Sequence, residues 1–327
     1  MASITHRSNR WQARIRRKGH PTQTRSFAKK QDAERWARTL EPAADRGTLL
    51  AGSGAEKLTL GEAIERYLSE VTPTLKGAKE DGFRLKALMR NPMCRLALAN
   101  VTPHRIAQFR DERLRMVSAG TVIRELAYLP ALINHARREW GFGIENPVSL
   151  VRKPAAPQGR NRILSPAEEV KLLDALEPVG RRNRWMLALV KLALETAMRR
   201  GELLALHWHD VSLTNRTAVL HLTKNSERRV VPLSGRAIEV LQTLPRSITV
   251  AVFPLTSYAA CAAFKGAVKR AGIDDLRFHD LRHTAITRMA DKLPNLIELA
   301  AVSGHKSLRM LQRYYHPKAE ELALKLA

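Results

Sequence analysis

The chain has 327 residues, 44% of them hydrophobic, which is enough for two or three domains with their own cores. Its 56 Lys and Arg residues outnumber 31 Asp and Glu residues, and a net charge of +25 predicts a polyanionic partner. Nucleic acid is the first candidate and an acidic membrane surface the alternative, but no apolar segment resembles a signal or a membrane span. Two cysteines exclude a disulfide framework or zinc ribbon and predict reduced thiols in a cytoplasmic protein.

The first thirty residues contain nine Lys or Arg residues and no acidic residue. Alternation in WQARIRR predicts a half-buried strand with a basic face, followed by a KGHP turn and a return strand at TQTRSFA. A helix over KKQDAERWARTLE completes a small module of residues 1–55 that is suited to a DNA groove, with a merely solvated basic face as the alternative. The DNA-contacting candidates here are Arg14, Arg16, Arg17 and Lys18.

Apolar residues recur at three- and four-residue spacing through residues 58–150, which predicts a domain of about four helices. Thr102 followed by Pro103 has the form of a helix start. The segment NPVSLVRKPAAPQGRNR then predicts a basic linker, in which Arg152 and Lys153 are further candidates for DNA contact.

A third unit opens at SPAEEVKLLDAL, where Ser165 is the expected N-cap and Glu168 closes a capping box. Two β-type runs around a polar turn in TAVLHLTKNSERRVVPLS predict a hairpin, and the remainder is mostly helical. The expected fold class is therefore mainly α with small β elements (α+β). The expected domains are an arm-type module, a helical domain and a mixed, mostly helical domain, at residues 1–55, 58–150 and 160–327.

Three stretches of the last unit contain side chains suited to chemistry. In LALETAMRRGELLAL, helical spacing places Arg199 and Glu202 on one face, although an ordinary surface ion pair is the alternative. Lys224 lies at the predicted hairpin turn, where a lysine is usually only solvated. In RFHDLRHTAITRMA, His279 and Arg282 are three residues apart. A metal on the histidines of this stretch is disfavoured, because the zinc-protease glutamate and any acidic cluster are missing.

A fourth stretch, GHKSLRMLQRYYHP, contains His305 after a glycine and two adjacent tyrosines, Tyr314 and Tyr315. Both tyrosines could be core aromatics. Taken with the other stretches, however, the residue types suit phosphodiester chemistry without a metal. Arginine forks grip phosphate oxygens, a tyrosine hydroxyl can attack once a base takes its proton, and lysine or histidine can protonate the leaving oxygen.

In this order and spacing, TAMRRGEL, a hairpin lysine, HDLRH, Gly-His and a tyrosine nine residues later resemble the tyrosine recombinase family, of the phage-integrase type. The resemblance implies that two arginines hold the scissile phosphate, the lysine is the general acid, one histidine assists proton transfer and the other bonds the phosphate. It also implies that the tyrosine forms a 3′-phosphotyrosine and that a glutamate orients the first arginine. These positions are Arg199, Arg282, Lys224, His279, His305, Tyr314 and Glu202. Ala197 and Ser303 depart from the family pattern, which often has glycine and leucine there.

The resemblance further implies an enzyme without metal, ATP or other cofactor, whose partner is double-stranded DNA. It is expected to be a monomer in solution and a homo-tetramer on DNA, with no membrane partner. Its expected location is cytoplasmic and nucleoid-associated, whether a bacterium or a phage encodes it. Integration and excision of a mobile element are the first expectation. The alternatives are shufflon-type inversion, an inactive DNA-binding relative, and a metal-dependent nuclease. The tail HPKAEELALKLA has a helical pattern and could pack on its own domain or on a neighbouring subunit.

Overall fold

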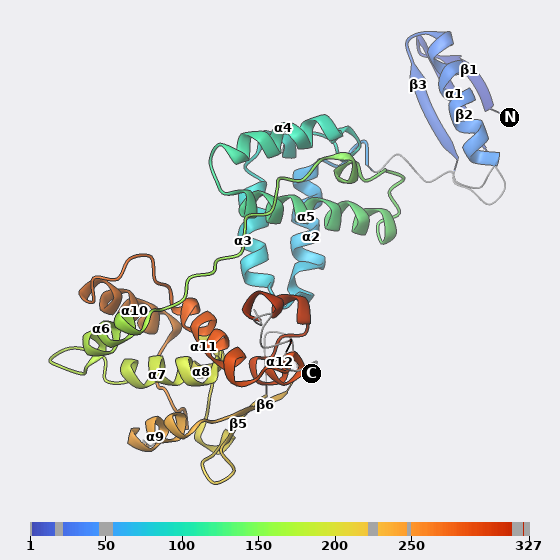
Figure 1. The fold of residues 1–327 in the computed structure, drawn as a ribbon. Helices are drawn as coiled ribbons and strands as arrows, with labels where there is room; N and C mark the ends of the chain where they lie inside the picture. Colours follow the sequence, from blue (N-terminus) through green and yellow to red (C-terminus); the bar gives the residue numbers. More distant parts are fainter. Residues whose placement is uncertain are drawn as a thin grey trace. The chain divides into compact units, whose positions relative to one another are not determined.

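The computed structural model describes residues 2–16, 22–45, 55–221, 228–246 and 250–315, together with Ala323. The chain divides into two compact units, Met1–Gln158 and Gly159–Ala327. Helices dominate both units, and each contains one small three-stranded antiparallel sheet (Figure 1), which confirms the expected fold class. No helix in the described ranges is both long and apolar enough to cross a bilayer. The finer division into three domains stays a prediction.

The first sheet has the order β1 (Ala2–Arg7), β2 (Arg10–Ile15) and β3 (Gln23–Phe27), and α1 (Lys30–Asp45) packs on it. The two predicted strands and the helix are confirmed, while β1 was not predicted. Positive φ angles at Ser8 and Asn9 form the two-residue turn between β1 and β2. Ala13 and Ile15 are buried, as the alternation in WQARIRR predicts.

The rest of this unit contains the predicted helices α2 (Leu60–Glu70), α3 (Ala78–Leu88), α4 (Pro103–Leu114) and α5 (Ala119–Arg138). Short 3-10 turns join them at η1 (Thr72–Thr74), η2 (Pro92–Arg95), η3 (Leu98–Asn100) and η4 (Pro147–Leu150). The expected start of α4 is confirmed, because the Thr102 hydroxyl accepts from the backbone N–H of Arg105 and Pro103 is the first helical residue. A single apolar core, which includes Leu60, Ile106 and Leu126, joins the four helices.

The second unit is built around α7 (Met186–Thr196), which is buried along most of its length. The surrounding helices are α6 (Pro166–Leu176), α8 (Arg200–Leu204), α9 (Gly235–Thr243), α10 (Ser257–Arg270), α11 (Phe278–Lys292) and α12 (Leu296–Ser303). The start of α6 confirms the predicted capping box, because the Ser165 hydroxyl and the Glu168 carboxylate bond each other's backbone N–H.

The second sheet has the order β4 (Val211–Ser212), β5 (Thr217–Leu220) and β6 (Arg229–Pro232), with the 3-10 turn η5 (Trp208–Asp210) before it. β5 and β6 pair antiparallel with Leu220 opposite Arg229, which confirms the predicted hairpin. Two further 3-10 turns, η6 (Leu308–Met310) and η7 (Gln312–Tyr314), follow α12.

Candidate active site

Arg199 stands at a break between two helices. α7 ends at Thr196, Ala197 takes a left-handed conformation with φ 52°, and Arg199 is the N-cap of α8. The prediction that helical spacing places Arg199 and Glu202 on one face is therefore wrong in its geometry, because the chain turns just before α8. Their pairing is present: Nη1 of Arg199 donates to Oε1 of Glu202 at 2.7 Å, and its backbone N–H donates to Oε2 at 2.9 Å. The carboxylate thus caps α8 and holds the guanidinium.

Glu202 also accepts a hydrogen bond from a second arginine, Arg229, at the start of β6. Nη2 of Arg229 donates to Oε2 of Glu202 at 2.9 Å, and both side chains are almost fully buried. Nε of Arg229 is buried and has no hydrogen-bond partner in the described part of the chain. Burial lowers the pKa of Arg229, Glu202 counteracts this, and Arg199 adds to it. One carboxylate therefore faces two guanidinium groups.

A third guanidinium, that of Arg282 on α11, joins this group and is 4% exposed. Its Nη2 donates to the Ser303 carbonyl at 2.6 Å, to which Nη1 of Arg229 also donates at 2.7 Å, and its Nη1 donates to the carbonyl of Ala197. Burial first, and then Arg199 and Arg229, lower the pKa of Arg282 to about 10, so the group stays charged at neutral pH. Three guanidiniums gathered around one carboxylate leave an excess positive charge, which suits an anion such as phosphate.

The end of α12 adds an imidazole to this cluster. Gly304 takes φ 70°, so the helix stops and the chain turns directly into His305. Nδ1 of His305 lies 2.7 Å from the Ser303 hydroxyl, which itself donates to the carbonyl of Leu299 at 2.6 Å. Burial first, and then the neighbouring arginines, lower the pKa of His305 to about 4. The ring is therefore neutral at pH 7 and fixed in orientation.

Tyr314 is the last residue of η7, and its side chain contacts His283 on α11. Its hydroxyl is hydrogen-bonded to Nδ1 of His283, and the two rings stack with centroids 5.8 Å apart and an interplanar angle of 28°. Burial raises the pKa of Tyr314, while Arg313 and Arg282 counteract this. Tyr315 is already past the turn, with an extended backbone (φ −106°, ψ 102°), so the two adjacent tyrosines differ in conformation.

The contacts of His283 decide which of its ring nitrogens carries a proton. Nη2 of Arg313 lies 3.3 Å from Nδ1, and a guanidinium can only donate, so Nδ1 accepts. Burial first, and then Arg313 and His279, lower the pKa of His283 to about 4, so its ring is neutral near pH 7. Nδ1 consequently has an unprotonated lone pair, to which both the hydroxyl of Tyr314 and Nη2 of Arg313 donate.

His279 lies one helical turn before His283, and the two rings meet edge to face with centroids 5.1 Å apart. His279 lines a cavity of about 180 Å³ together with Arg199 and Arg282, and burial lowers its pKa. The structure thus gathers most of the residues that the sequence singled out in the second unit. They are Arg199, Glu202, His279, Arg282, His305 and Tyr314.

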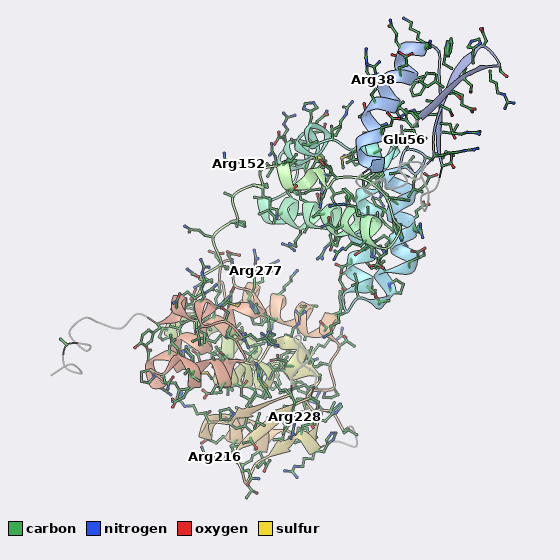
Figure 2. The ribbon with its side chains drawn as sticks, turned by 90° about the vertical axis from the view of Figure 1, so that its right-hand side faces the viewer. Arg38, Glu56, Arg152, Arg216, Arg228 and Arg277 are labelled. Carbon is green, nitrogen blue, oxygen red and sulfur yellow. The ribbon has the colours of Figure 1, made fainter. Side chains whose placement is uncertain are left out.

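The remaining candidate residues lie elsewhere. Lys224 and the pair Arg17 and Lys18 fall outside the described residues, as does most of the C-terminal tail. Arg14 on β2 is half-buried and Arg16 is exposed. Arg152 and Lys153 are exposed in the extended segment after η4, where Figure 2 marks Arg152. Their part in DNA contact stays a prediction.

Two residues of the site were not predicted, Arg229 and His283. Arg229 follows the hairpin turn and reads as one of several basic residues there. His283 directly follows Arg282, and its spacing from His279 drew attention to metal binding instead. The sequence does not show that Arg229 contacts Glu202 or that His283 contacts Tyr314, because the partners lie 27 and 31 residues apart along the chain.

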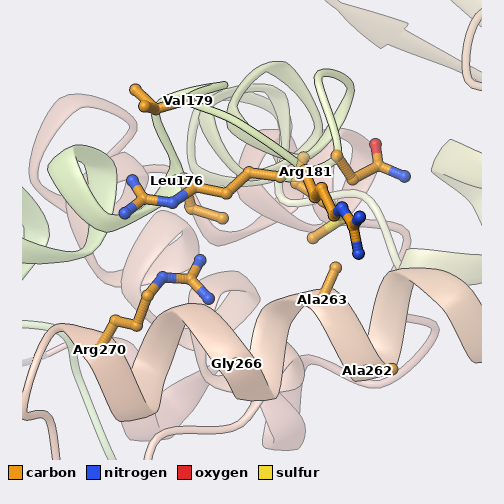
Figure 3. A pocket seen from close by; sticks show the side chains of 10 residues that line it. Leu176, Val179, Arg181, Ala262, Ala263, Gly266 and Arg270 are labelled. Atoms are coloured by element: carbon orange, nitrogen blue, oxygen red, sulfur yellow. The ribbon is translucent and has the colours of Figure 1, made fainter.

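A larger cavity of about 490 Å³ lies away from this group, between the end of α6 and α10. Figure 3 shows Arg181 and Arg270 on opposite sides of it, with Ala263 and Leu176 among its apolar lining. It contains none of the residues that surround Tyr314. Size alone therefore does not identify the reactive site in this chain.

Comparisons with known proteins agree with these observations. Residues 162–321 match the phage integrase family. The chain is 40% identical over 279 residues to a shufflon-specific DNA recombinase of Escherichia coli, and the match covers 83% of this chain and 72% of the relative.

Solved structures show the same fold. One is a lambda integrase tetramer bound to a Holliday junction, with a TM-score of 0.65 at 20% identity, covering 93% of this chain and 95% of the other. Another is the Tn1549 transposon integrase with circular intermediate DNA, with a TM-score of 0.67 at 16% identity, covering 83% and 99%. With the fold shared and the similarity to the recombinase spanning most of both sequences, the chain belongs to the phage integrase family of tyrosine recombinases.

Proposed function

We propose that this chain is a site-specific DNA recombinase that cleaves and rejoins DNA through a 3′-phosphotyrosine at Tyr314. The observation that supports this most is a cluster of three guanidiniums with one carboxylate: Arg199 and Arg229 bond Glu202, and Arg282 shares the Ser303 carbonyl with Arg229. Burial raises the pKa of Tyr314, and Arg282 of that cluster lies close enough to its phenol to counteract this rise. A bound phosphodiester would neutralise the excess positive charge of these arginines, close to the hydroxyl oxygen of Tyr314 that could attack it.

In the proposed first step, Arg199 and Arg282 hold the non-bridging oxygens of the scissile phosphate, and His305 bonds the same group. Two of the five guanidinium N–H bonds of Arg282 are used on backbone carbonyls, which leaves donors for the phosphate. Oη of Tyr314 attacks phosphorus, the bond to the 5′ oxygen breaks, and Lys224 gives that oxygen a proton. Rejoining reverses the step, and because the covalent bond conserves the phosphodiester energy, neither ATP nor a metal is needed.

The proton of Tyr314 needs an acceptor before attack, and His283 is the group in position to take it. Its Nδ1 accepts the hydroxyl hydrogen bond and is unprotonated near neutral pH. His279, which lines the cavity with the two arginines, assists proton transfer at the phosphate. Glu202 and Arg229 position Arg199 and the Ser303 carbonyl rather than touching the substrate.

The assembly we propose is a homo-tetramer on two double-stranded DNA sites, formed from monomers. Lambda integrase, which shares the fold, has been solved as a tetramer bound to a Holliday junction. In the unit Met1–Gln158, the basic residues Arg14, Arg16, Arg17 and Lys18, and the later pair Arg152 and Lys153, would contact DNA phosphates.

The proposed reaction could serve either of two biological processes, integration and excision of a mobile element or inversion of a DNA segment. Integration and excision of a mobile element fit the basic N-terminal segment. Inversion of a DNA segment is favoured by the 40% identity to a shufflon-specific DNA recombinase. The DNA recovered in covalent linkage to Tyr314 distinguishes them, because invertible segments carry inverted copies of the site, whereas an integrated element is flanked by direct copies.

The decisive experiment traps the protein on DNA that carries its site, in the presence of EDTA. Wild-type protein is expected to attach covalently to the 3′ phosphate, and Tyr314→Phe is expected to bind the DNA and form no adduct. Tyr315→Phe, which removes the neighbouring hydroxyl, is the matched control and should form the adduct. Adduct formation by Tyr314→Phe, or a strict requirement for a divalent metal, would refute the mechanism.

A further inference from the structure

A second cluster of polar side chains lies at the start of the sheet in the unit Gly159–Ala327, apart from the residues around Tyr314. It comprises His207, His209 and Asp210, in and beside the turn η5, and His221, directly after β5. One ligand-type atom from each of the first three residues lies within 4.8 Å of the others. Nε2 of His221 is 2.6 Å from Oδ1 of Asp210, and Nε2 of His209 is 3.4 Å from the same oxygen.

The backbone explains why these side chains meet. His207 forms a β-bridge with Ala251, and Trp208 donates its backbone N–H to the carbonyl of Val250 at 2.9 Å. The N–H of Asp210 then donates to the carbonyl of His207 at 3.1 Å, which closes a tight turn. This turn brings the rings of His207 and His209 to a centroid distance of 5.3 Å. Main-chain bonds thus place the cluster independently of any attraction between its side chains.

The environment of Asp210 is unusual for a chain with 56 Lys and Arg residues. Its side chain is 6% exposed, yet the ion pairs found for it in the described structure are with histidines, His209 and His221. Those two side chains are 63% and 59% exposed, so an ion from solvent can reach them. A structural hydrogen bond from His221 would explain one histidine at this carboxylate. It does not explain three.

Imidazole nitrogens and a carboxylate oxygen are ligands that Zn²⁺ takes in tetrahedral sites, at about 2.0–2.1 Å from the metal. Two such ligands of one ion then lie about 3.4 Å apart. The 3.4 Å between Nε2 of His209 and Oδ1 of Asp210 equals this value, and His207 completes a group of three ligand atoms that lie close together. The 2.6 Å between Nε2 of His221 and the same oxygen is a hydrogen-bond distance, so the His221 ring has to turn away from the carboxylate before it can become the fourth ligand. None of the four residues belongs to the proposed reaction.

We propose that His207, His209, Asp210 and His221 form a structural zinc site. The bound ion joins the turn before β4 to the end of β5 and so stabilises this edge of the sheet. It supplies no step of DNA cleavage, and the proposal is independent of the proposed function. The expectation from the sequence is that this chain has no metal ligand and no cofactor anywhere, and the proposed zinc site departs from that expectation.

The test uses the full-length protein, freed of metal with a chelator that is then removed. Titration with Zn²⁺ in competition with a chromophoric chelator is expected to show one ion bound per chain. Co²⁺ is expected to give the strong visible absorption of four-coordinate cobalt. Replacing a direct ligand in His209→Ala should weaken zinc binding by at least about tenfold. His221→Ala should do the same and lose the four-coordinate spectrum.

His104→Ala is the matched control, since His104 is an exposed histidine on α4 in the other unit. It should bind zinc like the wild type. Retention of full zinc affinity by His209→Ala, or an equal loss in His104→Ala, would overturn the site, as would a wild-type protein that binds no stoichiometric zinc. DNA cleavage by His209→Ala should equal that of the wild type, so failure of the recombinase assignment and failure of the zinc site are separable.

Discussion

His283 is the residue whose chemistry depends most on its neighbours. Its Nδ1 accepts from Tyr314 and its ring stacks on the phenol. We expect His283→Phe, which keeps an aromatic ring but removes the nitrogen, to slow covalent adduct formation by about a hundredfold or more, as loss of a general base does. Single-turnover adduct formation at saturating protein measures this separately from DNA binding.

DNA affinity should be retained in His283→Phe, because His283 bonds the tyrosine and Arg313. Adduct formation as fast as in the wild type would show that His283 does not accept the proton of Tyr314. A faster rate would mean that the hydrogen bond holds Tyr314 back rather than activating it.

Gly304 is required for two physical reasons that a pair of variants can separate. Its φ of 70° favours glycine, and a Cβ there would overlap the guanidinium of Arg229. Gly272 shares the positive φ, at 63°, but a Cβ there meets nothing within 4 Å. We expect Gly272→Ala to lower the free energy of unfolding by about 1–2 kcal/mol, which is the cost of the left-handed conformation.

Gly304→Ala should lose more than Gly272→Ala, and it should also lose DNA cleavage, because Arg229 is displaced from Glu202. Urea unfolding of both variants, with an adduct assay, measures the difference. Equal losses of stability together with full cleavage by Gly304→Ala would show that the contact with Arg229 is unimportant.

At the scale of elements, Glu202 joins α8 to β6. Its buried carboxylate accepts from Arg199 and Arg229, and Arg229 in turn reaches the end of α12 through the Ser303 carbonyl. We expect Glu202→Gln to lower the free energy of unfolding by about 3–5 kcal/mol, because buried guanidiniums lose the charge that neutralises them. Added phosphate or sulfate should restore part of the loss by occupying the same positive cluster.

Glu169→Gln is the control for Glu202→Gln, since Glu169 pairs with Arg288 where both side chains are partly exposed. It should cost at most about 1 kcal/mol and should not respond to anions. Chemical denaturation with and without phosphate measures both variants. A Glu202→Gln variant as stable as Glu169→Gln would argue against strong coupling of these elements.

At the scale of the whole molecule, stability should fall in acid. The folded chain holds the pKa of His283 and of His305 at about 4, below the usual value of 6.5. Between pH 6.5 and pH 4 these histidines are protonated in the unfolded chain but still neutral in the folded chain. The free energy of unfolding is therefore unaffected by them above pH 6.5 and decreases as the pH falls toward 4. Allowing for partial exposure, the two together account for about 1–2 kcal/mol.

Unfolding free energies measured at several pH values in that window test this expectation. The variant His305→Gln should show a shallower dependence than the wild type, and His104→Gln should show the wild-type slope. This comparison separates the buried histidines from the general repulsion that grows in a chain of net charge +25 as its carboxylates protonate. An unchanged slope in His305→Gln would be evidence against a neutral, buried imidazole.

Much of the local structure follows from sequence because its causes are local. The caps Thr102 and Ser165, the apolar spacing of α2 to α5, and the β-type runs of the hairpin each act within a few residues, and the structure has them all. The break at Ala197 was missed because the surrounding residues favour a helix. The carbonyl of Ala197 accepts from Arg282, a residue 85 positions away, and no local pattern reports that contact.

The sequence alone predicts a polyanionic partner and a mainly helical fold, and it presents Arg199, Arg282, His305 and Tyr314 as an ordered set in the last unit. The first two conclusions rest on composition and short-range spacing, and the third rests on the resemblance to a known family. Folding, in contrast, brings Glu202 to Arg229, Nδ1 of His283 to the hydroxyl of Tyr314, and three histidines to Asp210. Protonation and charge depend on burial and on groups brought together by folding, so these features exist only once the chain has packed.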